Sequence, residues 1–255
     1  MTRGKLDRSR LGVGILCRRG CTGLEEALRS LSDGGVFGLA GEATVLFQGR
    51  CPDGPPLAEQ YGLAWCSAAK KGTTVQGLRR LAEGMQSDLL LLLGQDAYLL
   101  CQPEAVAEQI GAAGELLLSG RAQTVRLGLR SPADLGPRRC IAYERFWGAG
   151  PLAPLRRAVH PIQARKAAGA AVFLHDCADR RHRGLIDRAD DGTYLVSSAC
   201  LPWTSRSVMV RRDFLLERIL PELGRSWLGR RRSEWEGRAW RRSGWRVGVP
   251  AGLFV

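Results

Sequence analysis

The sequence has no apolar run long enough to cross a bilayer, which needs roughly 20 apolar residues. Its eight cysteines include no CxxC pair, whereas disulfide scaffolds are shorter and denser in cysteine and zinc sites prefer closely spaced ligands. The basic N-terminus precedes only a short apolar stretch, Leu11 to Cys17, and no small-residue cleavage site follows it. We therefore expect a cytoplasmic protein with no membrane span and with reduced, mostly buried thiols.

Acidic residues are also in short supply. The chain has 38 Lys and Arg residues against 25 Asp and Glu residues, which leaves a formal charge of +13. Such an excess predicts attraction to an anionic partner, for example a nucleic acid, a membrane surface, a phosphorylated substrate or an acidic protein. The length of 255 residues and the hydrophobic content of 45% are those of a globular protein of one large or two small domains.

The most informative stretch runs from Ser87 to Leu100. Five consecutive leucines, Leu89 to Leu93, are followed by Gly94, Gln95 and Asp96. This pattern is typical of a strand buried on both faces of a parallel sheet. Ligands bind just beyond the carboxyl ends of such strands, where we expect Asp96. The alternative is a buried leucine-rich helix with Asp96 in a solvated turn.

Strands and helices alternate over the rest of the first half. We expect strands at 11–17, 43–48, 63–66 and 124–129. The expected helices begin at a capping box of Thr22 and Glu25, at Thr74 and at Pro103, and the first of them ends at Gly34 and Gly35. This order predicts βαβ units and a mostly parallel sheet.

The second half is less regular. The pattern dissolves into Pro, Gly and Arg over residues 131–163, and short strands are expected at 170–174, 194–196 and 206–210. A helix is expected from Asp213 to Leu220, where Pro221 would stop it. We interpret this half as an elaboration at the edge of the sheet.

Four segments in this order resemble the GT-A glycosyltransferases of family 2. They are TTVQG at 73–77, LLLLGQD at 90–96, VMVRRDF at 208–214 and SEWEGRAWRRSGWRVGVP at 233–250. The resemblance implies a single α/β GT-A domain over residues 1–255. Residues 1–130 would form its nucleotide-sugar-binding half and residues 131–255 its acceptor-side half.

The family's activity would be the inverting transfer of a sugar from a nucleotide donor to an acceptor. The donor would be a UDP-sugar such as UDP-N-acetylglucosamine or UDP-glucose, and the acceptor a small or carrier-tethered molecule of antibiotic or glycan biosynthesis. The positive charge suggests an acidic carrier protein. The family's DxD motif holds Mg²⁺ or Mn²⁺ against the diphosphate. Asp96 stands at its last position, but Gly94 and Gln95 occupy the other two. One carboxylate with several waters could still hold Mg²⁺, or arginines could neutralise the diphosphate instead.

The resemblance and the ends of the expected strands select the candidate site residues. Glu234 would be the catalytic base, with Glu236 as second choice. Desolvation among tryptophans would raise the pKa of Glu234, whereas an ion pair with Arg238 would leave it exposed and inert. Asp96 would be the metal ligand. The donor-side residues would be Arg18, Arg19, Gln48, Lys70, Lys71, Gln95, Asp96 and Trp203.

Two other classes of function stay open. Residues 225–246 interleave eight arginines with four tryptophans, which could hold phosphates and stack bases, although no helix-turn-helix, zinc-finger or RRM signature is present. The chain could also be a non-catalytic relative that binds nucleotide sugars. A metal-like group of His175, Asp176, Cys177 and His182 is surrounded by arginines, so we expect a solvated basic loop there.

Overall fold

The computed structural model describes residues 6–18, 20–68, 72–131, 135–224, 234–235 and 237–254. A nine-stranded sheet in the order β3-β2-β1-β4-β9-β5-β11-β7-β6 runs through the molecule, and a two-stranded sheet pairs β10 with β8. The strands are β1 Leu11–Cys17, β2 Glu42–Gln48, β3 Ala64–Ala68, β4 Leu89–Gly94, β5 Thr124–Arg126, β6 Ile186–Arg188, β7 Tyr194–Ser197, β8 Trp203–Thr204, β9 Val208–Arg211, β10 Glu234–Trp235 and β11 Arg246–Val249.

The pairing of the large sheet gives most of its strands one direction. β3, β2, β1 and β4 pair in parallel, β11 pairs in parallel with β5, and β9 and β7 run against their neighbours. The carboxyl ends of the other strands therefore meet at one edge. The α/β class with a mostly parallel central sheet is confirmed.

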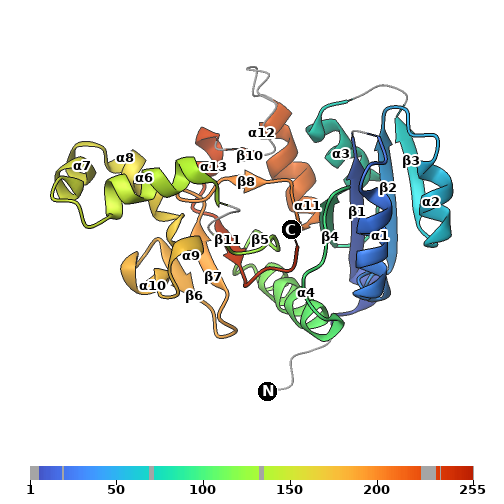
Figure 1. The fold of residues 1–255 in the computed structure, drawn as a ribbon, viewed down its shortest axis with the longest axis horizontal. Helices are drawn as coiled ribbons and strands as arrows, with labels where there is room; N and C mark the ends of the chain where they lie inside the picture. The colour runs from blue at the N-terminus through green and yellow to red at the C-terminus, as the bar shows by residue number, and fades with distance from the viewer. Residues whose placement is uncertain are drawn as a thin grey trace.

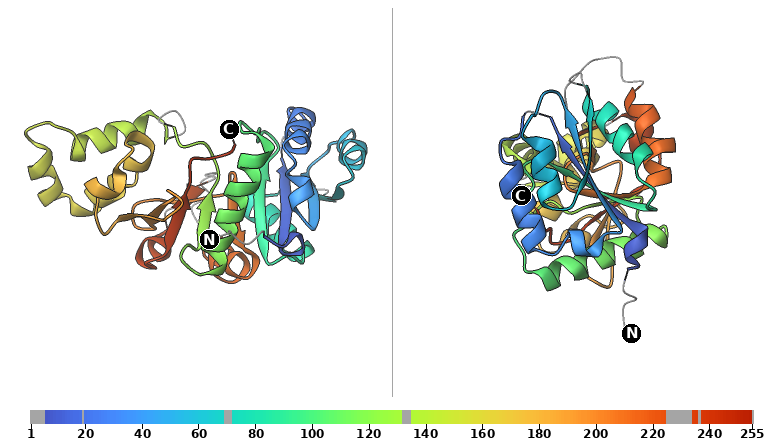
Figure 2. Two further views of the ribbon diagram at one scale, coloured as in Figure 1. Left: turned by 90° about the horizontal axis from the view of Figure 1, so that it is seen from below. Right: turned by 90° about the vertical axis from the view of Figure 1, so that its right-hand side faces the viewer.

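Helices cover both faces of the sheet (Figures 1 and 2). Buried residues of α1 and α4 join one core cluster, and those of α3 and the π-helical segment η3 join the other. None of the described helices is long and apolar enough to cross a membrane. The α-helices are α1 Leu24–Asp33, α2 Gly54–Gln60, α3 Thr74–Gly84, α4 Pro103–Leu118, α6 Pro137–Trp147, α7 Ala153–Val159, α8 Pro161–Ala168, α9 Ala171–Leu174, α10 Ala178–Arg181, α11 Arg212–Phe214, α12 Leu220–Gly224 and α13 Arg238–Arg242. The shorter helices are η1 Arg8–Arg10, η2 Phe37–Leu39 and η3 Leu215–Ile219.

The leucine strand β4 lies inside the sheet, between β1 and β9. Leu89, Leu91 and Leu93 point into the core cluster on one face, and the alternate leucines point into the cluster on the other face. All five are at most 1% exposed. A run of apolar residues without alternation is the pattern of a strand buried on both faces. The prediction of a strand rather than a helix is confirmed.

The first helix starts differently from the prediction. Gly23 is its N-cap, with φ of 79° and no side-chain cap hydrogen bond, so the expected capping box of Thr22 and Glu25 does not form. Only glycine adopts such left-handed backbone readily, and it delays the helix to Leu24. The expected end is confirmed, because Gly34 is the C-cap. A capping box does open α3, between Thr73 and Gln76.

Corrections concentrate in the second half. The irregular stretch 131–163 contains α6, α7 and the start of α8, and the strand expected at 170–174 is the helix α9. Helix formation also continues past Pro221, which lies in the first turn of α12 directly after η3. Proline has no N–H to donate, and the π-helical turn η3 directly before it interrupts the regular i to i−4 hydrogen bonds at this place.

The two expected halves share one sheet. β9 inserts between β4 and β5, and β11 pairs with β5, so strands from beyond residue 200 complete the sheet of the first half. The helices α6, α7 and α8 pack together at the end of the molecule opposite β3 (Figure 1; Figure 2, left).

Candidate functional site

A cavity of about 220 Å³ opens where the carboxyl ends of β4 and β5 meet the turn between β8 and β9. In the sheet, β9 lies between β4 and β5, so segments that are far apart in the sequence line the cavity together. The polar and charged residues of its lining are Asp96, Arg126, Arg139, Thr204, Arg206 and Ser207. This is the sheet edge at which ligands bind in open α/β folds.

Asp96 lies two residues beyond β4 and is exposed to solvent at this cavity. Its carboxylate folds back over Gly94, because a Cβ added at Gly94 would lie 2.7 Å from Asp96 Oδ1. An aspartate at position 94, as in a complete DxD motif, would therefore have to displace this carboxylate. The absence of a side chain at position 94 therefore leaves room for the Asp96 carboxylate in its present position.

Three arginines line the same cavity as Asp96. Arg126 extends from β5, Arg139 from α6 and Arg206 from the turn before β9. The Nη2 of Arg126 donates to the carbonyl oxygen of Pro202 at 2.5 Å, which anchors the guanidinium against the loop before β8. Guanidinium groups bind phosphate oxygens in paired, charge-assisted hydrogen bonds. The lining is therefore suited to a polyanion.

The turn that carries Arg206 has a strained backbone. Ser207 has φ of 44°, and it is the only non-glycine residue with positive φ in the described part of the chain. The N–H of Arg206 donates to Thr204 Oγ1 at 3.2 Å, and the carbonyl of Ser207 accepts from the N–H of Leu127 at 2.7 Å. Strain of this kind persists where the surrounding structure enforces it, often at functional sites. Here both Ser207 and the preceding Arg206 line the cavity.

The predicted base lies on the neighbouring strand. Glu234 in β10 pairs with Thr204 in β8, and Thr204 lines the cavity. The backbone of Glu234 is therefore one strand away from the arginine-lined wall. Glu236 lies outside the described residues.

Gln95 and Arg18 lie beside the cavity, where their hydrogen bonds go to neighbouring loops of the protein. The Arg18 N–H donates to Gln95 Oε1 at 2.7 Å, while Gln95 Nε2 donates to the carbonyls of Gly20 and Thr22, each at 3.1 Å. The Arg18 guanidinium donates to the hydroxyl of Thr74 at the start of α3. These two side chains fix the loop after β1 against β4 and α3.

The remaining donor-side predictions have different outcomes. Gln48 is 4% exposed, and its Nε2 donates to the carbonyl of Thr73 at 3.2 Å, so it lies beneath the start of α3 and not in the cavity. Trp203 is 2% exposed and packs edge-on against Trp240 at 6.2 Å between ring centroids. This tryptophan is therefore a core residue and does not line the cavity. The other three lie outside the described residues: Arg19, Lys70 and Lys71.

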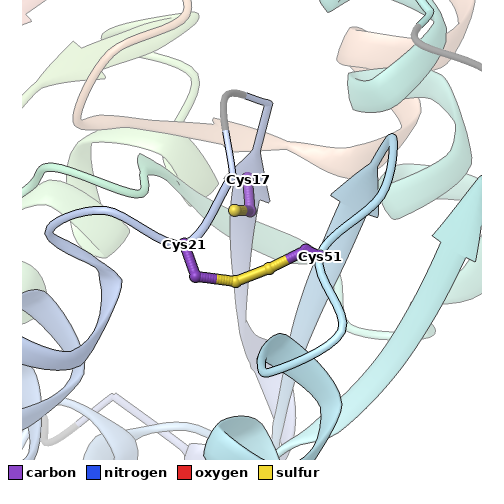
Figure 3. Close-up of side chains that lie close together, drawn as sticks. All are labelled: Cys17, Cys21 and Cys51. Carbon is purple, nitrogen blue, oxygen red and sulfur yellow. A yellow bond between two sulfur atoms is a disulfide. The ribbon is translucent and has the colours of Figure 1, made fainter.

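The cysteines also correct a prediction. Cys21 and Cys51 form a disulfide that joins the loop after β1 to the loop after β2 (Figure 3). The sulfur of Cys17 lies with them, all three sulfurs being within 4.8 Å of one another. Cys17 donates to the carbonyl of Gly20 at 2.9 Å, and burial raises the pKa of its thiol to about 11. With the disulfide formed, this group offers a metal one protonated thiol and no thiolate.

The expectation of a solvated basic loop around His182 also needs correction. His182 is 4% exposed, and its ring lies edge-on to Trp147 at 4.4 Å and 3.2 Å from the hydroxyl of Tyr143. The ring of His175 lies 5.3 Å from that of Tyr143. Burial lowers the pKa of both histidines, that of His182 to about 4. Buried His182 and Tyr143 thus form an aromatic cluster with half-buried His175 and Trp147, whereas Asp176 and Cys177 are exposed as expected.

The protein oxygen atoms at the cavity would supply only part of the ligand shell of a hard cation. Mg²⁺ is often held by one or two carboxylates together with substrate phosphates and waters. Asp96 supplies one carboxylate, and Thr204 and Ser207 add hydroxyl oxygens to the same lining. The residues present therefore fit a divalent cation that arrives with a diphosphate.

Neither protein-family models nor curated proteins match this sequence. Among solved structures, TarS residues 1–349 of S. aureus in complex with UDP-GlcNAc is 10% identical with a TM-score of 0.48, over 96% of this chain and 57% of that one. Glucosyl-3-phosphoglycerate synthase of Mycobacterium tuberculosis with Mn²⁺, UDP-glucose and phosphoglyceric acid is 22% identical with a TM-score of 0.41, over 63% and 53%. Mannosyltransferase PcManGT of Pyrobaculum calidifontis with GDP-Man and Mn²⁺ is 11% identical with a TM-score of 0.40, over 49% and 36%. The chain thus spans about half the length of the first two proteins and about a third of the mannosyltransferase.

Proposed function

We propose that the protein is a glycosyltransferase of the GT-A type that moves a sugar from a nucleotide donor to an acceptor with inversion. One observation carries the proposal: a single carboxylate and three arginines surround a cavity at the carboxyl edge of the parallel strands. The cavity lies directly after the strand that resembles the family's DxD segment. The nucleotide would be UDP, and the sugar N-acetylglucosamine or glucose.

The leaving group in this reaction is a nucleoside diphosphate. Arg126, Arg139 and Arg206 would bind its phosphates and stabilise the charge that develops as the glycosidic bond breaks. A bound Mg²⁺ or Mn²⁺, held by Asp96, would add Lewis-acid stabilisation of the same oxygens. Gln95 and Arg18 would act as positioning residues, because they hold the loop next to the cavity.

The acceptor needs a base on the opposite side of the sugar. Glu234 would take the proton of the acceptor hydroxyl, with Glu236 as the second candidate. Support comes from the strand pairing, since Glu234 is paired with Thr204 of the cavity wall. Inversion then follows from a single displacement.

A second cavity offers room for the acceptor. It measures about 290 Å³ and is lined mainly by α6, α8 and residues 198–202. Arg139 lines both cavities, so the two adjoin at this residue. Apolar side chains such as Phe146 and Leu201 share the lining with Lys166 and Arg241. This composition suits a small or carrier-tethered acceptor with an anionic group, and an acidic carrier protein would match the charge of the chain.

The test is a thermal-shift titration with UDP and with UDP-sugars, with and without Mn²⁺, followed by assay of UDP release. We expect UDP to stabilise the protein, Arg206→Gln to weaken that stabilisation, and Asp96→Asn to abolish both its Mn²⁺ dependence and turnover. Asp190→Asn, an exposed carboxylate in the turn between β6 and β7, is the matched control. Full turnover in Asp96→Asn would remove the assignment.

Two further results separate the alternatives. A non-catalytic nucleotide-sugar binder would show the UDP shift but release no UDP from any sugar donor. Glu234→Gln should lose acceptor-dependent turnover and keep donor binding; if Glu236→Gln does this instead, the base is Glu236. A nucleic-acid-binding protein would bind generic oligonucleotides with a steep loss of affinity as salt rises.

A further inference from the structure

Large apolar side chains are exposed mainly in one place. Seven of the described residues are large hydrophobic residues with exposed side chains, and five of them fall within 22 residues of the chain. These five are Ile141 (67% exposed), Leu152 (52%), Leu155 (60%), Val159 (62%) and Ile162 (66%). They belong to α6, α7, α8 and the residue before α7, which we call together the helical tip (residues 137–168). Figures 1 and 2 show these helices at the end of the molecule opposite β3.

The helix α7 exposes its apolar side to solvent and turns its arginines toward the rest of the protein. Leu152, Leu155 and Val159 follow the spacing i, i+3, i+7, which puts them on one side of the helix, and that side is exposed. Its two arginines turn the other way: Arg156 and Arg157 donate to main-chain carbonyls of α6, the latter to Phe146 at 2.8 Å. The charged groups thus attach α7 to its neighbour, while the apolar side chains face outward.

Positive charge surrounds the apolar residues. Residues 137–168 contain seven Arg and Lys residues and one acidic residue, Glu144. Arg138 and Arg145 are exposed and stand three residues before and four residues after Ile141, on the same face of α6. Arg165 is exposed three residues after Ile162 on α8.

We propose that the helical tip binds the surface of a membrane that contains anionic lipids. Outward apolar side chains flanked by arginines are the combination that places a helix in the lipid interface, with its apolar residues below the headgroups and its cations among the phosphates. Leu155, Val159 and Ile162 would enter the interface, and Arg138 and Arg145 would bind lipid phosphates. Because basic residues outnumber acidic residues in the tip, we expect it to prefer an anionic lipid surface to an uncharged one. This inference does not depend on the proposed enzymatic activity.

The experiment is co-sedimentation of the full chain with vesicles of phosphatidylcholine alone or mixed with phosphatidylglycerol. We expect binding to the mixed vesicles that weakens as salt rises, and little binding to phosphatidylcholine alone. The double variant Leu155→Asp/Val159→Asp should weaken binding on the order of tenfold or more. Arg138→Gln/Arg145→Gln should weaken it about fivefold for each charge removed and reduce the salt dependence.

Leu100→Asp is the matched control, because Leu100 is 55% exposed but lies outside the helical tip. It should bind vesicles as the unchanged protein does. All variants alter exposed side chains, so thermal unfolding should confirm that they fold. Absence of binding to the mixed vesicles would overturn the proposal, as would binding that the Leu155→Asp/Val159→Asp variant retains. Self-association without lipid that this variant abolishes would assign the surface to a second copy of the chain, and would also overturn it.

Discussion

The buried imidazole of His182 makes folding sensitive to acid. Burial is the main reason that its pKa is lowered to about 4, and the charges of His175, Arg181 and Arg157 act in the same direction. An unfolded histidine titrates near pH 6.5. Between these two values the unfolded chain takes up a proton that the folded protein does not, so the free energy of unfolding falls as the pH falls.

The size of the effect follows from this window. Each pH unit between about 6.5 and about 4 changes the free energy of unfolding by up to about 1.4 kcal/mol, and the whole window by about 3–3.5 kcal/mol because the slope is smaller near its two ends. Above pH 6.5 the contribution is complete, and below pH 4 no more is lost. Nearby carboxylates add their own pH dependence, so the measurement has to be a difference between variants.

The assay is urea denaturation of the protein and of His182→Gln at several pH values from 4 to 7.5. Glutamine keeps a polar group within reach of the Tyr143 hydroxyl and does not titrate. We expect the unchanged protein to lose about 3 kcal/mol more than His182→Gln over this range. His160→Gln, at an exposed position between α7 and α8, should behave as the unchanged protein. Equal pH dependence in the protein and in His182→Gln would refute the reasoning.

Three other predictions concern stability and the loop beside the cavity. Cys51→Ser removes the disulfide to Cys21, which closes a loop with a sequence separation of 30, and should lower the free energy of unfolding by about 3–4 kcal/mol in urea titrations under oxidising conditions. Gly169→Ala puts a methyl group against the main-chain carbonyl of Cys200 and should cost about 1–3 kcal/mol in the same assay. Gln95→Ala removes the hydrogen bonds that hold the loop after β1 and should reduce the thermal shift produced by UDP without unfolding the protein; an unchanged shift would contradict the positioning role.

Sequence patterns predict the first half well because its central strands β1 and β4 are buried on both faces and its helices on one. A run such as Leu89 to Leu93 fits few other structures, and the apolar positions of α3 recur at helical spacing. The disulfide was not predicted, because Cys21 and Cys51 come together only through the parallel pairing of β1 with β2. A spacing of 30 residues carries no signal for that contact.

The helical tip shows why the second half was harder to predict. In its helices α7 and α8 the buried positions are alanines such as Ala153, Ala164 and Ala168, whereas the large apolar residues of these two helices face solvent. Hydrophobic periodicity, which indicates a helix through large apolar residues on its buried face, therefore gives no helix signal for α7 and α8. The short apolar run 170–174 is ambiguous for the opposite reason, since a buried strand and a buried helix turn look alike over five residues.

The candidate site was predictable at one point only. Asp96 follows a recognisable strand, and its place at the sheet edge follows from the strand itself. The arginines come from β5, α6 and the turn before β9, and no local pattern distinguishes them from the chain's other arginines. Only the sheet order, with β9 between β4 and β5, places Arg126 and Arg206 in the lining of the cavity that Asp96 also lines. The paired basic residues that the sequence favoured instead are either loop anchors, as Arg18 is, or outside the described residues.

Helix α6 connects the two proposals made above. Arg139 lines both cavities and Ala142 lines the larger one, whereas Arg138, Ile141 and Arg145 lie on the exposed face of the same helix. A helix bound at a lipid surface through the second group would therefore hold the wall of the acceptor cavity about one helix diameter, roughly 10 Å, from the headgroups. An acceptor attached to a lipid could reach that cavity without leaving the membrane, whereas a freely diffusing acceptor would gain nothing from the attachment. Whether added vesicles raise turnover only with lipid-linked acceptors thus distinguishes an acceptor-delivery role of the helical tip from simple anchoring.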